Sequence, residues 1–335
     1  MNPSLLVTLA DKNYVNYAKQ LFSSVYWNAG WKGDYMLLAH EIPAEDLAWF
    51  RNKGILVKEC APINMKKLAG TFPLSALNKL YLFTPEFKKW NNIIFLDPDI
   101  IVRSSLDKIA KVKGFNAVQD GLKLGRLRHQ LNFHDDPNLF RQFKKKFKLR
   151  APALNSGVLA FSTDIITDTL FEDLLRTGKE YEEICTHAEQ TVLSLFFYKK
   201  WKKLSFLYNF IIPIIVVVYR QRIESFNPVV IHCCDKPKPW SPQSQLYKEW
   251  LANMEKSELI DLTKRPDGIP NHLFRLKIIW YSLKFTFIKY NTLLQDRLRN
   301  LKNSIDKDIG RIGIILKNKY PSLFYQLQNV LLKKK

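Results

Sequence analysis

The sequence predicts an α/β fold, and three observations support that prediction. Residues 1–110 alternate short apolar runs with helical patterns, as βαβ units do. Residues 93–96 are uniformly apolar, which is typical of a strand whose two faces are both covered by helices. Asp97-Pro98-Asp99 follows at once, and this strand is expected to end there because Pro98 cannot donate to a sheet ladder.

The first half of the chain supplies the elements of this fold in order. Apolar residues recur at helical spacing between Val15 and Val25, which indicates a helix with one buried face. Gly54 is suited to close a second helix. We expect strands at residues 5–9, 35–39 and 92–96, and helices at residues 14–27, 44–53 and 74–83.

The middle of the chain is less regular. Residues 114–150 are polar and basic, and we expect an irregular segment that is either a binding loop or a solvated basic face. Strand character returns at residues 154–161 and 229–231, and residues 188–199 are expected to be helical. No internal repeat is expected.

The character of the chain changes near its C-terminal end, and we expect a main domain over residues 1–262 and a basic helical region over residues 263–335. Residues 271–335 hold 14 Lys and Arg against 3 Asp and Glu, about half of the formal charge of +21. One apolar helical stripe runs through this region, formed by Leu294, Leu298, Leu301, Ile305, Ile309 and Ile312. A basic amphipathic helix with aromatic residues suits a membrane surface, and packing on the main domain or on a partner chain is the alternative.

Composition narrows the class of protein further. The four cysteines form no C-x-x-C pair, so neither a zinc site nor a disulfide framework is expected. The N-terminal residues resemble a first strand rather than a signal peptide. The apolar run at residues 210–219 is shorter than the ~20 residues that span a bilayer. We expect a cytoplasmic protein, peripherally attached to the inner face of a membrane, and no nucleic-acid partner because no nucleic-acid-binding module is recognisable.

Asp97 and Asp99 are the first candidate functional residues. Side chains at positions i and i+2 lie on the same side of an extended chain, so the two carboxylates can converge on one cation. Ligands of open α/β sheets bind beyond the carboxyl ends of the strands. The pair therefore indicates a divalent metal that holds a phosphate, and a pair that only forms a turn or caps a helix remains the alternative.

Five segments read together carry a resemblance to a known family. In chain order the segments are Ala10-Asp11-Lys12-Asn13-Tyr14, the Asp97–Asp99 pair, Leu154-Asn155-Ser156-Gly157-Val158, His187-Ala188-Glu189-Gln190-Thr191, and the run from Val230 to Trp240 that contains His232 and Lys238. In this order and spacing the chain resembles glycosyltransferase family 8, the group of glycogenin and the lipopolysaccharide galactosyltransferases, over roughly residues 4–245. The resemblance implies a single mixed Rossmann-like sheet of the GT-A type.

The resemblance also implies an activity, which is transfer of a hexose from a UDP-sugar, with retention of configuration, to a glycan or lipid-linked acceptor. Asp97, Asp99 and His232 would bind Mn²⁺ or Mg²⁺, a mixed oxygen and nitrogen ligand set that suits these ions. The metal would assist departure of UDP as a Lewis acid.

The family's nucleotide-binding and sugar-binding positions fall on further residues of this chain. Asp11 and Asn13 would recognise uracil, while Tyr14 would either stack on the base or belong to the core. Lys79 and Lys238 would face the diphosphate. The donor sugar would be held by Asp120, Asn155, Glu189 and Gln190, and catalysis would rest on Glu189 and Gln190.

Two departures from the family's pattern leave a second function open. Glu189 stands where the family usually has Asp, and Asp235 stands where it has a Gly that lets the diphosphate approach the backbone. Asp235 adds a negative charge, which disfavours phosphate unless a cation such as Lys236 offsets it. The alternative is therefore an inactive nucleotide-binding or glycan-binding scaffold.

Overall fold

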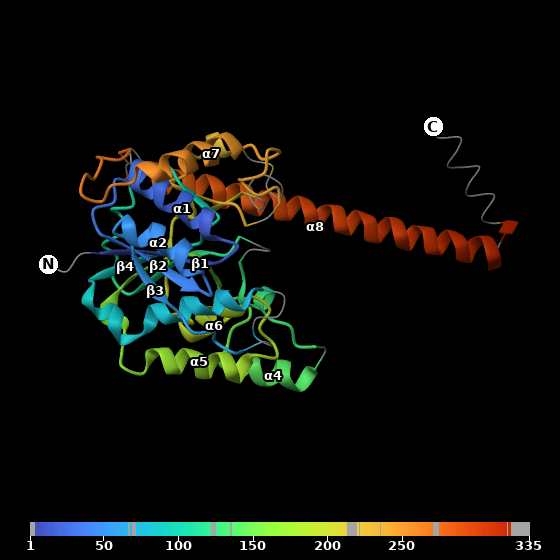
Figure 1. Cartoon of the computed structure of the whole chain (residues 1–335). Coiled ribbons are helices and arrows are strands. Elements are labelled where there is room, and N and C mark those ends of the chain that lie inside the picture. The colour runs from blue at the N-terminus through green and yellow to red at the C-terminus, as the bar shows by residue number, and fades with distance from the viewer. Residues whose placement is uncertain are drawn as a thin grey trace. The chain divides into compact units, whose positions relative to one another are not determined.

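The structure is a computed structural model that describes residues 4–322, except residues 66–67, 69–71, 122–124, 135, 213–219, 221, 235, 271–274 and 320. Its main sheet has seven strands in the order β3-β2-β1-β4-β7-β6-β8. The four strands β3, β2, β1 and β4 are parallel, whereas β7 runs antiparallel to both β4 and β6. The predicted mixed α/β sheet is confirmed, and helices flank it (Figure 1).

The strands have the following bounds: β1 (Leu5–Asp11), β2 (Asp34–His40), β3 (Leu56–Glu59), β4 (Asn92–Leu96), β5 (Ile100–Val102), β6 (Phe115–Gln119), β7 (Leu154–Ser162), β8 (Lys202–Leu204), β9 (Phe210–Ile211) and β10 (Val230–His232). The α-helices are α1 (Val15–Ser24), α2 (Ala44–Asn52), α4 (Pro137–Lys146), α5 (Leu170–Tyr181), α6 (Ala188–Phe196), α7 (Tyr247–Glu255) and α8 (Arg275–Lys319). Residues 25–29 continue α1 as a π-helix, and Leu74–Phe83 forms a 3₁₀ helix, η2, where an α-helix was a natural expectation.

A small second sheet accompanies the main one. It has the order β5-β10-β9, with β10 antiparallel to β5 and parallel to β9. The resemblance implied a single sheet, and β5 and β9 are too short to show a period that would have indicated a second one. This small sheet places His232 opposite Ile100, immediately after the Asp97–Asp99 pair.

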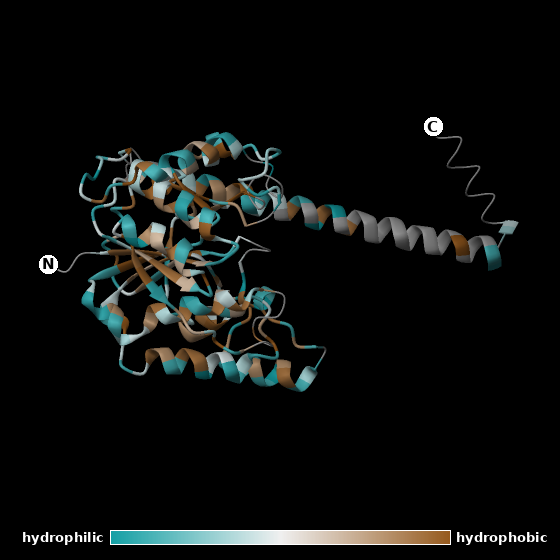
Figure 2. Cartoon of the chain, in the orientation of Figure 1, coloured by the Kyte–Doolittle hydropathy of each residue, from teal (hydrophilic) through white to brown (hydrophobic). Residues whose placement is uncertain are grey.

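The core lies between the main sheet and its helices. The inner strands β1 and β4 are almost fully buried, and Figure 2 shows the strands of this sheet largely in brown. Phe83, Phe95 and Phe161 are among its largest fully buried side chains. Thr8 is a buried polar residue in β1, and its hydroxyl donates to the carbonyl of Leu96 at 2.7 Å, tying the ends of two strands together beside the Asp pair.

Residues 114–150 are irregular only in part, whereas the sequence indicated an irregular segment throughout. They contain β6 and the helix α4, which Asp136 caps by accepting hydrogen bonds from the backbone of Asn138 and Leu139. Phe143 of α4 is 3 % exposed and packs against Tyr181 of α5. The lysines of this segment hid the helix, because they occupy its solvent face while the phenylalanines face the core.

The contacts of the chain divide it into a unit of residues 1–282 and a unit of residues 283–335. The unit of residues 1–282 includes the first turns of α8, where Tyr281 packs against Phe226. The unit of residues 283–335 is helical as far as Lys319 among the residues described. Within the described part of the chain, no helix combines the length and the hydropathy needed to cross a bilayer.

Candidate active site

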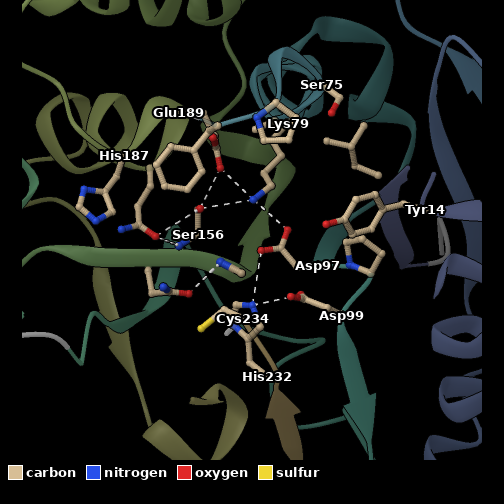
Figure 3. A pocket seen from close by; sticks show the side chains of 18 of the residues that line it. Tyr14, Ser75, Lys79, Asp97, Asp99, Ser156, His187, Glu189, His232 and Cys234 are labelled. Atoms are coloured by element: carbon tan, nitrogen blue, oxygen red, sulfur yellow. Dashed lines mark hydrogen bonds and ion pairs between the residues drawn. The ribbon is translucent and has the colours of Figure 1, made fainter. Parts of the chain in front are cut away.

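A cavity of about 350 Å³ lies beyond the carboxyl end of β4. Because β7 is antiparallel to β4 and Val158 lies opposite Leu96, residues 154–157 at the start of β7 extend past the end of β4. The start of α6 and the end of β10 complete the wall (Figure 3). Nine of the eleven predicted site residues line this cavity: Asp11, Lys79, Asp97, Asp99, Asp120, Asn155, Glu189, Gln190 and His232.

Asp97, Asp99 and His232 meet at one point of the cavity. The imidazole Nε2 of His232 lies 3.2 Å from Asp99 Oδ1 and 3.8 Å from Asp97 Oδ2. One potential ligand atom from each of the three residues lies within 4.8 Å of the others. The structure therefore brings together three side chains that the sequence separates widely.

The donor chemistry of this trio fits a divalent cation. Two carboxylates and one imidazole suit Mn²⁺ or Mg²⁺. The opposite ring nitrogen of His232, Nδ1, lies 2.9 Å from Asn209 Oδ1, so Nε2 is the atom presented to the two acids. Metal-binding histidines usually have their second nitrogen fixed in this way.

Two lysines neutralise the acids from opposite sides. Lys79 Nζ lies 2.8 Å from both Asp97 Oδ1 and Glu189 Oε1, and its side chain is 7 % exposed. Lys238 Nζ lies 2.7 Å from Asp99 Oδ2 and also donates to the carbonyl of Cys233. Burial alone would lower the pKa of Lys79, but the charges of Asp97 and Glu189 outweigh it and raise that pKa, so Lys79 stays a cation.

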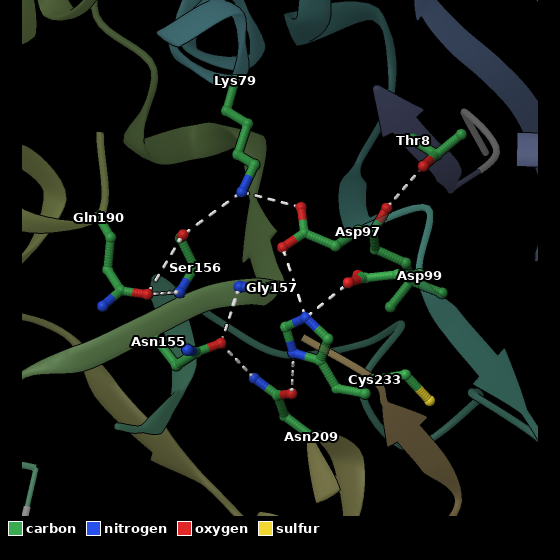
Figure 4. Close-up of polar contacts among 12 residues, drawn as sticks. Thr8, Lys79, Asp97, Asp99, Asn155, Ser156, Gly157, Gln190, Asn209 and Cys233 are labelled. Carbon is green, nitrogen blue, oxygen red and sulfur yellow. Dashed lines mark hydrogen bonds and ion pairs between the residues drawn. The ribbon is translucent and has the colours of Figure 1, made fainter. Parts of the chain in front are cut away.

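The start of β7 and the start of α6 are joined by polar contacts in the cavity wall. The hydroxyl of Ser156 donates to Glu189 Oε1 at 2.9 Å (Figure 3). Its backbone N–H donates to Gln190 Oε1 at 3.0 Å (Figure 4). These two hydrogen bonds fix the orientation of the Glu189 and Gln190 side chains. Sequence reasoning missed Ser156, which stood unremarked between Asn155 and Gly157.

The wall of the cavity beyond α6 is formed by Asp120 and His187. Gln130 Nε2 donates to Asp120 Oδ2 at 3.1 Å and to the carbonyl of Leu154, which ties the end of β6 to β7. Burial lowers the pKa of His187 against the opposing charges of Asp120 and Glu189, so its ring is neutral at pH 7. His187 lies near Phe72 at the edge of the same cavity, with ring centroids 5.9 Å apart.

The end of β1 forms the opposite wall. Asp11 accepts a hydrogen bond from the hydroxyl of Ser75 and another from the backbone N–H of Asn13. Tyr14 lines the cavity, and its partial burial raises the pKa of its hydroxyl.

Asn13 and Lys238 are the two predicted residues that do not line the cavity: Asn13 is exposed, and Lys238 lies against Asp99. Asp235 lies outside the described residues.

Gly157 makes room for His232. A Cβ atom at position 157 would lie 2.3 Å from His232 Cε1 and 2.6 Å from His232 Nδ1. Such distances are shorter than real contacts, so the imidazole rests directly on the glycine backbone. The imidazole of His232 thus occupies the space that a side chain at position 157 would need.

Comparisons with known proteins agree with this arrangement. The sequence profile described as glycosyl transferase family 8 matches residues 5–244. Galactinol synthase 4 of Arabidopsis thaliana is 25 % identical over 234 residues, which are 65 % of this chain and 66 % of that protein. Glycosyltransferase GlyB of Streptococcus pneumoniae is 27 % identical over 294 residues, which are 80 % of this chain and 66 % of that protein. The chain thus spans about two thirds of the length of these curated relatives.

Solved structures show the same fold. The galactosyltransferase LgtC, solved with donor and acceptor sugar analogs, aligns with a TM-score of 0.53 at 17 % identity and covers 78 % of this chain and 98 % of that one. The glycosyltransferase GlyE of Streptococcus pneumoniae aligns with a TM-score of 0.56 at 18 % identity and covers 78 % of this chain and 63 % of that one. The main sheet is therefore of the GT-A type, as the resemblance implied. With the family profile matched over most of its length, the chain belongs to glycosyl transferase family 8.

Proposed function

We propose that this protein is a retaining glycosyltransferase that moves a hexose from a UDP-sugar to a glycan or lipid-linked acceptor, with a divalent cation, Mn²⁺ or Mg²⁺, bound by Asp97, Asp99 and His232. The observation that carries the proposal is the meeting of these three ligand groups at the edge of the cavity, where Lys79 pairs with Asp97 and Lys238 pairs with Asp99. A cation held there would neutralise charge that grows on the leaving UDP.

The chain's own residues would share the recognition of the donor. Asp11 and Asn13 would read the edge of the uracil ring, since a carboxylate and an amide match its imide group. Lys238, now paired with Asp99, would turn one N–H toward a diphosphate oxygen. Asp120, Asn155 and Glu189 would hold the sugar hydroxyls.

Gln190 is the group we place next to the anomeric carbon. Its side-chain orientation is fixed because Ser156 N–H donates to its oxygen. A neutral amide is a weak nucleophile, so retention would proceed with the leaving phosphate oxygen taking the proton of the acceptor hydroxyl on the same face. Lys79 and Ser156 would hold the Glu189 side chain in place during this step.

Substitution of the acids tests the proposal. We expect Asp97→Asn and Asp99→Asn each to lower Mn²⁺-dependent hydrolysis of UDP-glucose or UDP-galactose more than 100-fold while the fold is kept, because the cation loses a charged ligand. Asp107→Asn, at an exposed position away from the cavity, is the matched control. Unchanged turnover in both variants would exclude this mechanism.

One observation favours the inactive scaffold as a second function. Glu189 Oε1 already contacts both Lys79 and Ser156, so this oxygen is engaged within the protein instead of being offered to a sugar hydroxyl. Calorimetric titration with UDP and Mn²⁺, run beside the hydrolysis assay, separates the two functions. Binding without turnover of any UDP-hexose would favour the scaffold.

The C-terminal unit would bring the enzyme to the inner face of a membrane, where a lipid-linked acceptor lies. Its apolar stripe repeats every 11 residues, which corrects the expectation of no repeat: Leu283, Phe287 and Tyr290 are followed by Leu294, Leu298 and Leu301, and then by Ile305, Ile309 and Ile312. An 11-residue period corresponds to about 3.67 residues per turn over three turns. This value is close to that of a straight α-helix, so the stripe stays on one side of the helix. The first six of these side chains are exposed, between 56 % and 74 %.

Charge favours a lipid surface over a second copy of this helix. Arg297, Arg299 and other cations lie beside the stripe, and two such helices would repel each other, whereas anionic lipid attracts each Lys or Arg by about 1 kcal/mol. Membrane contact is thus the part of the proposal that rests on the C-terminal unit alone.

A further inference from the structure

A hydrogen-bonded chain of side chains links the sugar-facing wall of the cavity to the metal-facing wall. It starts at the backbone N–H of Gly157, which donates to Asn155 Oδ1 at 3.0 Å. Asn209 Nδ2 donates to the same oxygen at 2.7 Å, and Asn209 Oδ1 lies 2.9 Å from His232 Nδ1 (Figure 4). Asn209 is 2 % exposed and is not among the residues that line the cavity.

The first hydrogen bond determines which end of every later group in this series donates and which end accepts. A backbone N–H can only donate, so Asn155 must turn its carbonyl oxygen toward Gly157. Asn209 then has to present its NH₂ group to that oxygen, which leaves its own carbonyl oxygen for His232. An amide oxygen can only accept, so Nδ1 of His232 carries the proton and Nε2 is the atom available to a metal.

The same chain also sets the orientation of Asn155. Its carbonyl oxygen receives two donors, so the NH₂ group is the polar end that Asn155 turns to the cavity. Asn209 therefore acts on two residues through the two ends of one amide. An aspartate at this position could accept a hydrogen bond from His232 Nδ1, but it has no N–H group to donate to Asn155.

We propose that Asn209 is a positioning residue that fixes the ring tautomer of His232 for the cation and the amide orientation of Asn155 for the donor sugar. The inference rests on the proposed function, since it concerns how the metal and donor sites are held. It goes beyond the family motif, because Asn209 lies outside every segment that carried the resemblance.

Two substitutions of Asn209 have different expected effects. Asn209→Ala removes both contacts, so we expect Mn²⁺ affinity to fall 10- to 100-fold, the usual cost of losing the partner of a metal-binding histidine. Asn209→Asp keeps an acceptor for Nδ1, so we expect Mn²⁺ affinity equal to or above that of the wild type. In the same variant Asn155 has to turn its NH₂ away from the cavity, so the affinity for UDP-galactose or UDP-glucose relative to UDP should fall about fivefold.

The measurements are made on the full chain and need no turnover. Mn²⁺ binding is followed by the electron paramagnetic resonance signal of the free ion, and nucleotide binding by calorimetry with UDP, UDP-glucose and UDP-galactose. Asn116→Ala is the matched control, because Asn116 is also buried and its amide donates to the carbonyls of Lys113 and Gly114, away from the cavity. Thermal unfolding verifies that each variant is folded.

The outcomes separate this inference from the proposed function. Weak Mn²⁺ binding in Asn209→Ala together with near-normal binding in Asn209→Asp supports the positioning residue. Equal Mn²⁺ affinity in all variants, or equal losses in Asn209→Ala and Asn209→Asp, overturns it while the metal site stands. Failure of the wild type itself to bind Mn²⁺ and UDP overturns the proposed function instead.

Discussion

Single side chains set the distances at the metal-facing wall of the cavity. The imidazole of His232 lies against the backbone of Gly157, and Lys79 spans the gap between Asp97 and Glu189. Each of these contacts involves a buried group, so the loss of one partner leaves another without compensation. The consequences of single substitutions are therefore sharp and can be stated in advance.

Gly157→Ala is expected to displace His232 from the two acids. The new methyl group would overlap the imidazole ring, so we expect Mn²⁺ affinity to fall at least tenfold and the protein to lose about 1–3 kcal/mol of stability. Titration with Mn²⁺ and urea denaturation measure the two effects. Gly178→Ala in α5 is the control, since the nearest atoms to its added methyl group belong to the side chains of Leu68, Met65 and Val192, away from the imidazole of His232. Wild-type Mn²⁺ affinity in Gly157→Ala would contradict the overlap.

Through Asp99, the free energy of unfolding of the metal-free protein is expected to depend on pH in the acidic range. Burial works to raise the pKa of Asp99, but the charges and hydrogen bonds of His232 and Lys238 outweigh it and hold that pKa below its usual range. A lowered pKa stabilises the fold above the unfolded value of about 3.9, and this contribution is lost as pH falls toward the folded value. In the presence of EDTA we expect a loss of up to about 1.4 kcal/mol per pH unit below pH 4 from this group.

Urea denaturation at pH 2.5–6 tests this dependence. The slope should be shallower in Asp99→Asn, which has no carboxyl group to titrate, and unchanged in Asp168→Asn, whose parent side chain is 89 % exposed. Equal slopes in the wild type and Asp99→Asn would show that other groups dominate acid unfolding.

At the scale of the elements, the site depends on how neighbouring strands and helices are joined. The reversal of β7 next to β4 places Asn155, Ser156 and Gly157 beside the Asp pair. The small sheet delivers His232 from β10, and the loop that follows is held to α1, where the ring of Trp240 stacks on Tyr17 with centroids 3.6 Å apart. Lys238 lies in this loop, so α1 helps to place its ammonium group.

Trp240→Ala is expected to release that loop. Loss of the stack should cost about 2 kcal/mol of stability and weaken UDP binding in the presence of Mn²⁺ about tenfold, because Lys238 is no longer held near the diphosphate. Trp240→Phe should retain most of both properties, since a ring still covers Tyr17. Trp49→Ala, another half-buried tryptophan, is the control for stability loss alone. Calorimetry with UDP that finds equal affinity in Trp240→Ala and the wild type would rule out this link.

At the scale of the whole molecule, the chain carries two units with different surfaces. The unit of residues 1–282 holds the cavity, and the unit of residues 283–335 holds the apolar stripe and most of the C-terminal cations. The proposed catalysis and the proposed membrane contact are therefore open to separate tests.

The triple variant Leu294→Ser, Leu298→Ser and Leu301→Ser tests the membrane surface. We expect the full-length wild type to float with vesicles that contain anionic lipid, and the variant to bind at least tenfold more weakly while it hydrolyses soluble UDP-sugar normally. Neutral vesicles and 0.5 M salt should weaken binding of the wild type, because the cations contribute through charge. Unchanged flotation of the variant, or a change from dimer to monomer in light scattering, would point to another occupant of the stripe.

Much of the fold was predictable from local pattern. The buried run before Asp97, the strands at β1 and β7, and the helix after Asn13 follow from hydrophobic periodicity, which the chain expresses residue by residue. The segment around β6 and α4 was missed because its lysines mask an apolar face, and β9 was missed because two residues show no period.

The sequence by itself determined which acidic, histidine and amide residues follow the strands. Those residues in turn determined the class of chemistry and the family. Only the tertiary structure decided that Ser156 fixes Glu189 and Gln190, that Gly157 yields its space to His232, and that Asn209 joins His232 to Asn155. The physical reason is that these contacts join segments far apart in the chain. A hydrogen bond across such a distance depends on strand register and on the pairing of β10 with β5, and neither leaves a periodic signal in the sequence.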